Sequence, residues 1–410
     1  MRPLLLLLLL LPPAAAQTGP LDVLTGTAAA PDTLSADARV SLLTMLPGDE
    51  VYSLWGHSGF RIRDPQTGLD KAYNYGTFDF EQPGFLVRFL RGRLDYILDT
   101  APFGREVQRY QYFGRPMIEQ ELALTPPARQ ALYDLLEENA RPENRAYRYD
   151  IVWDNCSTRL LDMLDRAVAA GGMADRVTLF PPAEAATYRD LLDPYTAERP
   201  WIDLGTDLVM GLPTDGVASA RDHAFLPLGL MEAADTATIR GRPLVSRRDT
   251  VFWVPGAGET LPAFPWPTVL AWALFLAAAA GTVAMRARGG AARLRRLGAR
   301  LDGLLFFVAG TAGLVLFLMW VASDHRIAEA NVELSWLWPT HLAAAAALAR
   351  PALSRFWRRY ATAAAMATAF VVVFWVGWPE PMHPALVPVA LLLAARGALR
   401  GLAGPEAPPA

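Results

Sequence analysis

The single cysteine of the chain, Cys156, has a sequence context typical of a nucleophile. Leu160 and Leu164 follow it at helical spacing, which predicts a helix that begins at or just after the thiol. A thiol at a helix N-terminus faces unpaired backbone amides and the positive end of the helix dipole, and both favour the reactive thiolate. The same amides can stabilise an oxyanion. A lone cysteine is often a small buried hydrophobe, but this position favours catalysis.

His57 is the candidate base for this thiol. Phe60 and Ile62 alternate with polar residues after it, and this period of two predicts a strand with His57 at its start. A second short strand is predicted at residues 71–75. A histidine at a strand edge is by itself more often a surface residue, so the interpretation depends on its pairing with Cys156. We expect the two side chains to lie within hydrogen-bonding reach.

An orienting residue beside the histidine would complete such a site. Asn74, on the second predicted strand, is the first candidate and Asp79 is the second, and each is equally a common turn residue. Asp154 and Asn155 stand just before the thiol and are of helix-capping types. The predicted supporting residues are Ser58, Asp79, Asp154 and Asn155.

The elements that must position these residues divide into an exported part and a membrane part. Arg2, an apolar run and the small residues 14–16 form a secretory signal, and the apolar run is too short to cross a bilayer. The predicted organisation is a signal peptide (1–16), a lead-in (17–38), an α+β catalytic domain (39–247), a Pro-rich linker (248–266) and an all-α membrane domain of about five helices (267–402).

Long apolar segments predict the membrane spans. The segments 267–285, 303–322 and 360–379 are each long enough to cross a bilayer. The segments 334–349 and 381–395 are shorter, and either could be a tilted or interfacial helix instead. The loops between alternate spans are rich in arginine, which predicts that those loops lie inside and that the catalytic domain lies outside.

The composition narrows the classes of partner. The 38 basic and 41 acidic residues nearly cancel, so we expect no nucleic acid as a partner. No histidine spacing is typical of a metal site, and we expect neither a metal nor a cofactor.

Three further features have two interpretations each. Residues 85–90 predict an amphipathic helix, which could lie on lipid headgroups or pack in the core. Asp324 and His325 follow the second predicted span, where they could touch lipid or cap a helix. Alternating aromatic residues could line an acyl groove, although such residues are usually core: Tyr73, Tyr75, Phe78 and Phe80.

The order of the two site residues resembles that of a known group of thiol enzymes. A thiol at a helix start with a histidine on a neighbouring strand is similar to the papain-type arrangement, and a histidine that precedes the cysteine is similar to the permuted NlpC/P60 group. A closer resemblance is to the bacterial Lnb N-terminal periplasmic domain family. The segments that carry it are 54–62, 73–80, 154–158 and 225–227, with 323–339 in the membrane half.

That family includes a lipoprotein N-acyltransferase. The resemblance therefore implies a papain-like periplasmic domain in which Cys156 is the nucleophile and His57 the base, on a multi-pass protein of the bacterial inner membrane. It implies a membrane phospholipid as acyl donor and a lipoprotein N-terminus as a possible acceptor, joined by a Cys thioester. The alternatives are a cell-wall peptidase of NlpC/P60 type and a non-enzymatic membrane scaffold.

Overall fold

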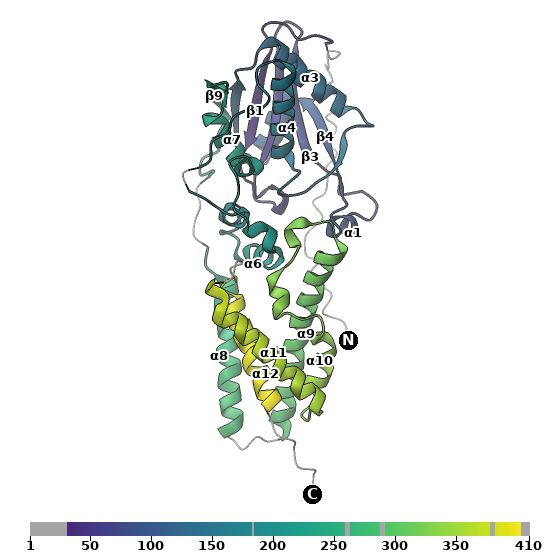
Figure 1. Ribbon diagram of the computed structural model, residues 1–410, viewed down its shortest axis with the longest axis vertical. Coiled ribbons are helices and arrows are strands. Elements are labelled where there is room, and N and C mark those ends of the chain that lie inside the picture. The colour runs from purple at the N-terminus through teal and green to yellow at the C-terminus, as the bar shows by residue number, and fades with distance from the viewer. Residues whose placement is uncertain (1–30, 183, 259–262, 288–291, 378–381, 403–410) are drawn as a thin grey trace.

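The computed structural model describes residues 31–182, 184–258, 263–287, 292–377 and 382–402. A domain of mixed sheet and helix stands on an elongated helical region (Figure 1). This is the predicted order of an α+β domain followed by helices. The predicted signal peptide, residues 1–16, and the lead-in as far as residue 30 lie outside the described residues.

The regular elements have the following bounds. The strands are β1 (Arg39–Met45), β2 (His57–Asp64), β3 (Leu69–Thr77), β4 (Asp95–Pro102), β5 (Met117–Leu122), β6 (Ala146–Arg148), β7 (Thr238–Ile239), β8 (Arg242–Pro243) and β9 (Val245–Phe252). The helices of the sheet domain are α1 (Phe85–Leu90), α2 (Phe103–Tyr112), α3 (Pro126–Ala140), α4 (Cys156–Ala170), α5 (Tyr188–Leu192), α6 (Pro200–Val209) and α7 (Pro227–Thr236). The helical region contains α8 (Trp266–Ala287), α9 (Ala292–Ala322), α10 (His341–Leu348), α11 (Arg355–Phe374) and α12 (Leu386–Leu402). Short 3-10 turns are η1 (Val51–Ser53), η2 (Asp193–Tyr195), η3 (Leu212–Asp215), η4 (Asp222–Phe225), η5 (Arg326–Ala328), η6 (Val332–Ser335) and η7 (Trp375–Gly377).

One antiparallel sheet, in the order β6-β4-β3-β2-β1-β5-β9, forms the body of the domain. Phe60 and Ile62 of β2 pack in one core with Leu160 and Leu164 of α4, and α3 and α7 cover the same face. α2 packs on the opposite face. The predicted strands at residues 57 and 71–75 and the predicted helix at residue 156 are confirmed.

The last strand extends beyond the predicted domain boundary. β9 pairs with β5 as far as Phe252, so residues 248–252, predicted as linker, belong to the sheet. Val251 and Phe252 pack against the core beneath α2, and this burial of apolar surface favours the extended pairing.

Two helices of the helical region match the predicted spans. Within the described residues, α8 and α9 are the two helices that are long and apolar enough to cross a membrane, in agreement with the segments 267–285 and 303–322. α11 begins with an arginine-rich turn and ends at Phe374, where the chain turns into η7. Of the predicted span 360–379, residues 360–374 are α-helix and residues 375–377 form η7, and residues 378 and 379 lie outside the described residues. α10 and α12, at the two weaker predictions, have 8 and 17 residues.

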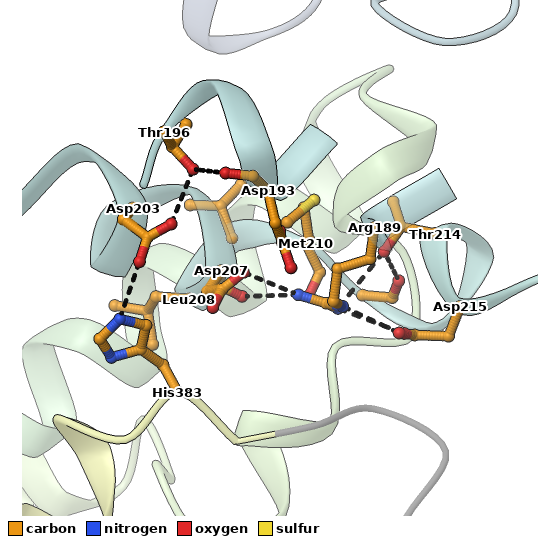
Figure 2. A network of polar contacts seen from close by, with 12 residues as sticks. Arg189, Asp193, Thr196, Asp203, Asp207, Leu208, Met210, Thr214, Asp215 and His383 are labelled. Atoms are coloured by element: carbon orange, nitrogen blue, oxygen red, sulfur yellow. Dashed lines mark hydrogen bonds and ion pairs between the residues drawn. The ribbon is translucent and has the colours of Figure 1, made fainter. Parts of the chain in front are cut away.

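Polar contacts fix α6 between α5 and the helical region (Figure 2). Arg189 of α5 is 2% exposed and pairs with Asp215 at 2.8 Å and with Asp207 of α6 at 3.4 Å. His383, just before α12, lies 3.2 Å from Asp203 of α6. α6 thus makes polar contacts both with α5 of the sheet domain and with the segment just before α12 of the helical region.

Apolar and backbone contacts extend this junction. Leu204 and Leu208 of α6 pack against the core of the helical region. Asn331 Nδ2 donates to the carbonyl of Leu208 at 2.9 Å, and the backbone N–H of Gly211 donates to the carbonyl of Ile327 at 2.7 Å. α6 therefore belongs to the sheet domain by sequence and to the helical region by packing.

Candidate active site

Asn155 fixes the start of α4 and, with it, the position of Cys156. Its Oδ1 accepts hydrogen bonds from the backbone N–H groups of Ser157 and Thr158 at 2.9 and 3.0 Å, which is the N-cap pattern. Its Nδ2 donates to two carbonyls, one of them that of Phe225 at 2.9 Å. Both polar atoms of the side chain are thus used for positioning, and they connect α4 to the segment 225–227.

Asp154 also stabilises the first turn of α4. Its carboxylate forms a two-point ion pair with Arg159 at 2.6 and 2.7 Å. The guanidinium of Arg159 also stands 3.6 Å from the ring centre of Tyr147. These contacts join the first turn of α4 to β6 and limit the movement of the thiol.

His57 begins β2 and is oriented by Asn74 of β3. His57 Nε2 lies 3.2 Å from Asn74 Oδ1. Because a carbonyl oxygen only accepts, Nε2 carries the proton and Nδ1 is left with a free lone pair. A Cβ on residue 59 would lie 2.7 Å from Asn74 Oδ1, so Gly59 is required for this approach. Of the two candidate orienters, Asn74 is the one beside the imidazole.

The thiol and the imidazole approach the start of β2 from opposite faces of the sheet. His57 stacks on Tyr110 of α2, whereas Cys156 is 6% exposed and belongs to the core beneath α4. The backbone amide of Ser58, the residue after His57, interacts with the thiol, and Ser157 Oγ lies 3.9 Å from it. Within the described residues no hydrogen bond joins the thiol to the ring, so direct contact between them stays a prediction.

Two residues near the pair have no signal in the sequence. The rings of Tyr110 and His57 stack with centres 6.4 Å apart. Arg115 is 8% exposed, donates to the carbonyl of Leu46 at 2.9 Å, and leaves one guanidinium nitrogen without a hydrogen-bond partner. No spacing rule relates these positions to His57 or Cys156, because they come together only through the packing of α2 on the sheet.

The other predicted contributors lie elsewhere. Asp79 is exposed, and its carboxylate accepts from the backbone N–H of Glu81 at 2.8 Å, as a turn residue does. Asp324 pairs with Arg93 at 2.8 Å, and His325 Nε2 lies 2.7 Å from the carbonyl of Phe89. Asp324 and His325 thus hold α1 and the turn after it, and none of these contacts is with Cys156.

Comparison with protein families covers both parts of the chain. Residues 29–194 match the model of the Lnb N-terminal periplasmic domain, and residues 259–403 match that of the Lnb transmembrane domain. The chain belongs to the Lnb family. No curated protein and no solved structure matches it.

Membership of the Lnb family establishes a membrane-anchored protein with a periplasmic domain. The N-terminal match includes His57, Asn74 and Cys156. The segment 225–227 lies between the two matched ranges, although Phe225 contacts Asn155 directly.

Burial sets the protonation of the site in this Lnb-family chain. It raises the pKa of the Cys156 thiol, and the backbone amides of Ser58 and Ser157 only partly oppose this effect. Burial and the charge of Arg115 lower the pKa of His57 to about 3. The position of Cys156 at the start of a helix was expected to favour a thiolate. Instead, the resting state has a neutral thiol and a neutral imidazole, because the effect of burial on the pKa of Cys156 outweighs that of the backbone amides.

We expect this resting state to appear in the pH dependence of Cys156 alkylation. Thiolate reacts with iodoacetamide, so a raised thiol pKa predicts a rate that climbs through the alkaline range, above the midpoint of a free thiol at about 8.5. The low pKa of His57 predicts that the rate follows this single thiol titration, with no second inflection between pH 5 and pH 7, where an ordinary histidine titrates at about 6.5.

Alkylation of the sole cysteine can be followed by intact mass from acidic to alkaline pH. The same chain unfolded in urea is the control, and its midpoint should be that of an ordinary thiol. A rate that reaches its plateau below neutral pH would contradict the prediction, because it would show a resting thiolate–imidazolium pair.

Proposed function

We propose that this Lnb-family protein is a thiol acyltransferase that moves a fatty acyl group from a membrane phospholipid to a lipoprotein amine. The observation that most supports the proposal is Cys156 at the capped start of α4, against the backbone amide of Ser58, which directly follows the Asn74-oriented His57 in β2. We also propose that the domain is a permuted relative of the papain-like, NlpC/P60 fold. A membrane anchor favours lipid as the acyl donor, because it holds the thiol near the leaflet.

The first half-reaction forms an acyl-enzyme. The Cys156 thiol gives its proton to His57 Nδ1 as the sulfur attacks the ester carbonyl carbon. The amides of Ser58 and Cys156 are the donors available to the oxyanion. The carbon–oxygen bond then breaks, the leaving alkoxide takes the proton from Nδ1, and a lysophospholipid departs. Both side chains start neutral, so proton transfer accompanies attack.

The second half-reaction transfers the acyl group. A neutral amine attacks the thioester carbonyl and gives a proton to His57 Nδ1. The carbon–sulfur bond breaks, and the departing Cys156 sulfur recovers that proton. The amide product leaves, and the site returns to its neutral resting state. Catalytic hydrogen bonds often form only once substrate binds, and we expect the imidazole and the thiol to come into contact in the complex.

Mass spectrometry of the purified full-length chain tests the proposal. The chain is incubated with a phospholipid of one defined acyl chain, and a mass increase equal to that acyl group is expected on Cys156. Neutral hydroxylamine should remove the adduct, as it cleaves thioesters. A lipidated peptide with a free α-amine should take up the same acyl group.

The peptidase alternative gives a different result. It predicts cleavage of muropeptides by the wild-type chain, no cleavage by Cys156→Ser, and no lipid-derived adduct. If neither the adduct nor cleavage occurs, the scaffold alternative becomes the leading one.

A further inference from the structure

The apolar side chains of α1 face outward. Leu86, Val87, Phe89 and Leu90 are each more than two-fifths exposed, and no residue of α1 is buried. Phe80 and Tyr52 are more than half exposed and extend the same patch through ring contacts. Packing of this helix into the core, one of its two expected roles, is therefore excluded. We call α1, Phe80 and Tyr52 the α1 surface. Contiguous exposed apolar patches mark binding surfaces.

The α1 surface is fixed to the end of a candidate membrane span. The backbone N–H of Asp324 donates to the carbonyl of Arg91 at 2.9 Å, and the carboxylate of Asp324 makes two hydrogen bonds to Arg93. His325 contacts the carbonyl of Phe89. Gly92 has φ +65°, and a Cβ there would lie 3.1 Å from the backbone of Asp324. α1 therefore stands beside the end of the helical region nearest the sheet (Figure 1).

The position of this attachment points to lipid as the partner. Asp324 is two residues beyond the end of α9, where an apolar span gives way to polar residues, so α1 lies close to the headgroup layer. Trp320 and Val321, in the last turn of α9, are exposed as well. The charge of Arg91, an exposed residue at the end of the helix, complements phosphate, whereas Arg88 and Arg93 pair with Asp95 and Asp324.

A row of rings leads from the α1 surface to the thiol. Phe89 stacks on Phe85 and Phe85 on Phe78, each pair with centres 6.1 Å apart. Phe78 contacts Tyr96 at 5.1 Å, and Tyr96 stacks on Tyr149 at 4.3 Å. A Cβ on Gly76 would meet Tyr149 at 3.5 Å and the Cβ of Cys156 at 3.7 Å. Tyr149, at the end of this row, and Cys156 thus both lie next to Gly76.

We propose that the α1 surface enters the outer leaflet of the membrane that holds α9, and that the ring row guides one lipid acyl chain to Cys156. The first part stands on the exposure and attachment of α1. The second part rests on the proposed acyl transfer. Flat aromatic faces provide an apolar route that does not bind any one chain length tightly.

Depth-dependent quenching tests the membrane contact. Cys156→Ser provides a chain without cysteine, into which Leu86→Cys and, separately, Phe180→Cys are introduced and labelled with a fluorophore. Phe180 is a matched control because it is half exposed and follows the opposite end of α4 from Cys156. In vesicles of phosphatidylethanolamine and phosphatidylglycerol with brominated acyl chains, we expect strong quenching at position 86 and none at position 180. Equal quenching at both positions would overturn the proposal.

A charge placed on the α1 surface tests the route. Leu86→Glu should slow acyl-enzyme formation from vesicle phospholipid by about tenfold or more, because the transfer of a carboxylate from water into the apolar part of a membrane is unfavourable. Phe180→Glu should leave the rate unchanged. Both sites are exposed, so both variants should fold. Equal rates in the two variants would contradict the route. If even the wild-type chain forms no acyl-enzyme, the proposed function fails, while the quenching result still decides the membrane contact.

Discussion

Replacing Cys156 with serine is expected to reduce acyl transfer by about 10⁴-fold or more while the protein stays folded and inserted in the membrane. A hydroxyl occupies nearly the same volume as a thiol, so the buried start of α4 should keep its packing. The pKa of a serine hydroxyl is far above that of a thiol, and one imidazole and a few amides cannot compensate for this difference. The measurement is single-turnover formation of the acyl-enzyme, with the lipidated peptide as acceptor.

His57→Ala is expected to lower the same rate by about 10²- to 10⁴-fold, the usual contribution of a general base. Asn74→Ala should cost less, roughly 10²-fold, because the ring remains but loses its orientation. The losses in Cys156→Ser and His57→Ala should not add in the double variant, since both side chains serve one step. Losses that multiply would show that the two residues act independently and would contradict the shared mechanism.

Arg189→Ala is expected to destabilise the packing of α5 against α6 and η3 by about 3–5 kcal/mol, the usual result of removing one partner of a buried ion pair. The change leaves the carboxylates of Asp215 and Asp207 buried without their guanidinium. Hydrogen exchange of the backbone amides in residues 188–215 measures the effect on the detergent-solubilised full chain, because it reports local opening.

Arg199→Ala is the matched control for that measurement. Arg199 pairs with a fully exposed carboxylate, that of Asp49, so its removal should cost less than about 1 kcal/mol. Adding Asp215→Asn to Arg189→Ala should restore part of the loss, since it removes one uncompensated charge. Similar exchange rates in Arg189→Ala and Arg199→Ala would show that the Arg189 ion pairs do not hold α6 against α5.

Local pattern was enough to predict the elements that carry the site. The alternation after His57 predicted β2, and the leucine spacing after Cys156 predicted α4, because each pattern is determined by neighbours in sequence. Local pattern offered Asn74 as the first candidate and Asp79 as the second, without deciding between them. The pairing of β2 with β3 separates them, since it places Asn74 beside the imidazole and leaves Asp79 in a turn.

The features that the sequence did not reveal depend on contacts between distant segments. Tyr110 reaches His57 from α2, and Arg189 contacts α6 and η3, and neither contact has a fixed spacing along the chain. The protonation of Cys156 was misjudged for a related reason. Helix-start amides are visible in a sequence, whereas the burial that outweighs them comes from the whole fold. The span 360–379 was overestimated because apolar composition does not show where α11 stops.

The packing of α6 imposes an order on the biogenesis of the protein. α6 precedes both candidate spans in the chain, yet the carbonyl of Ile327 and the side chain of Asn331, which receive its end, follow the second of them. Export delivers the N-terminal segments first, so we expect Leu204 and Leu208 of α6 to stay uncovered until α8 and α9 have been made and packed. Completion of the sheet domain would then be coupled to assembly of the helical region, and a chain released before that point would expose apolar surface and be prone to aggregation.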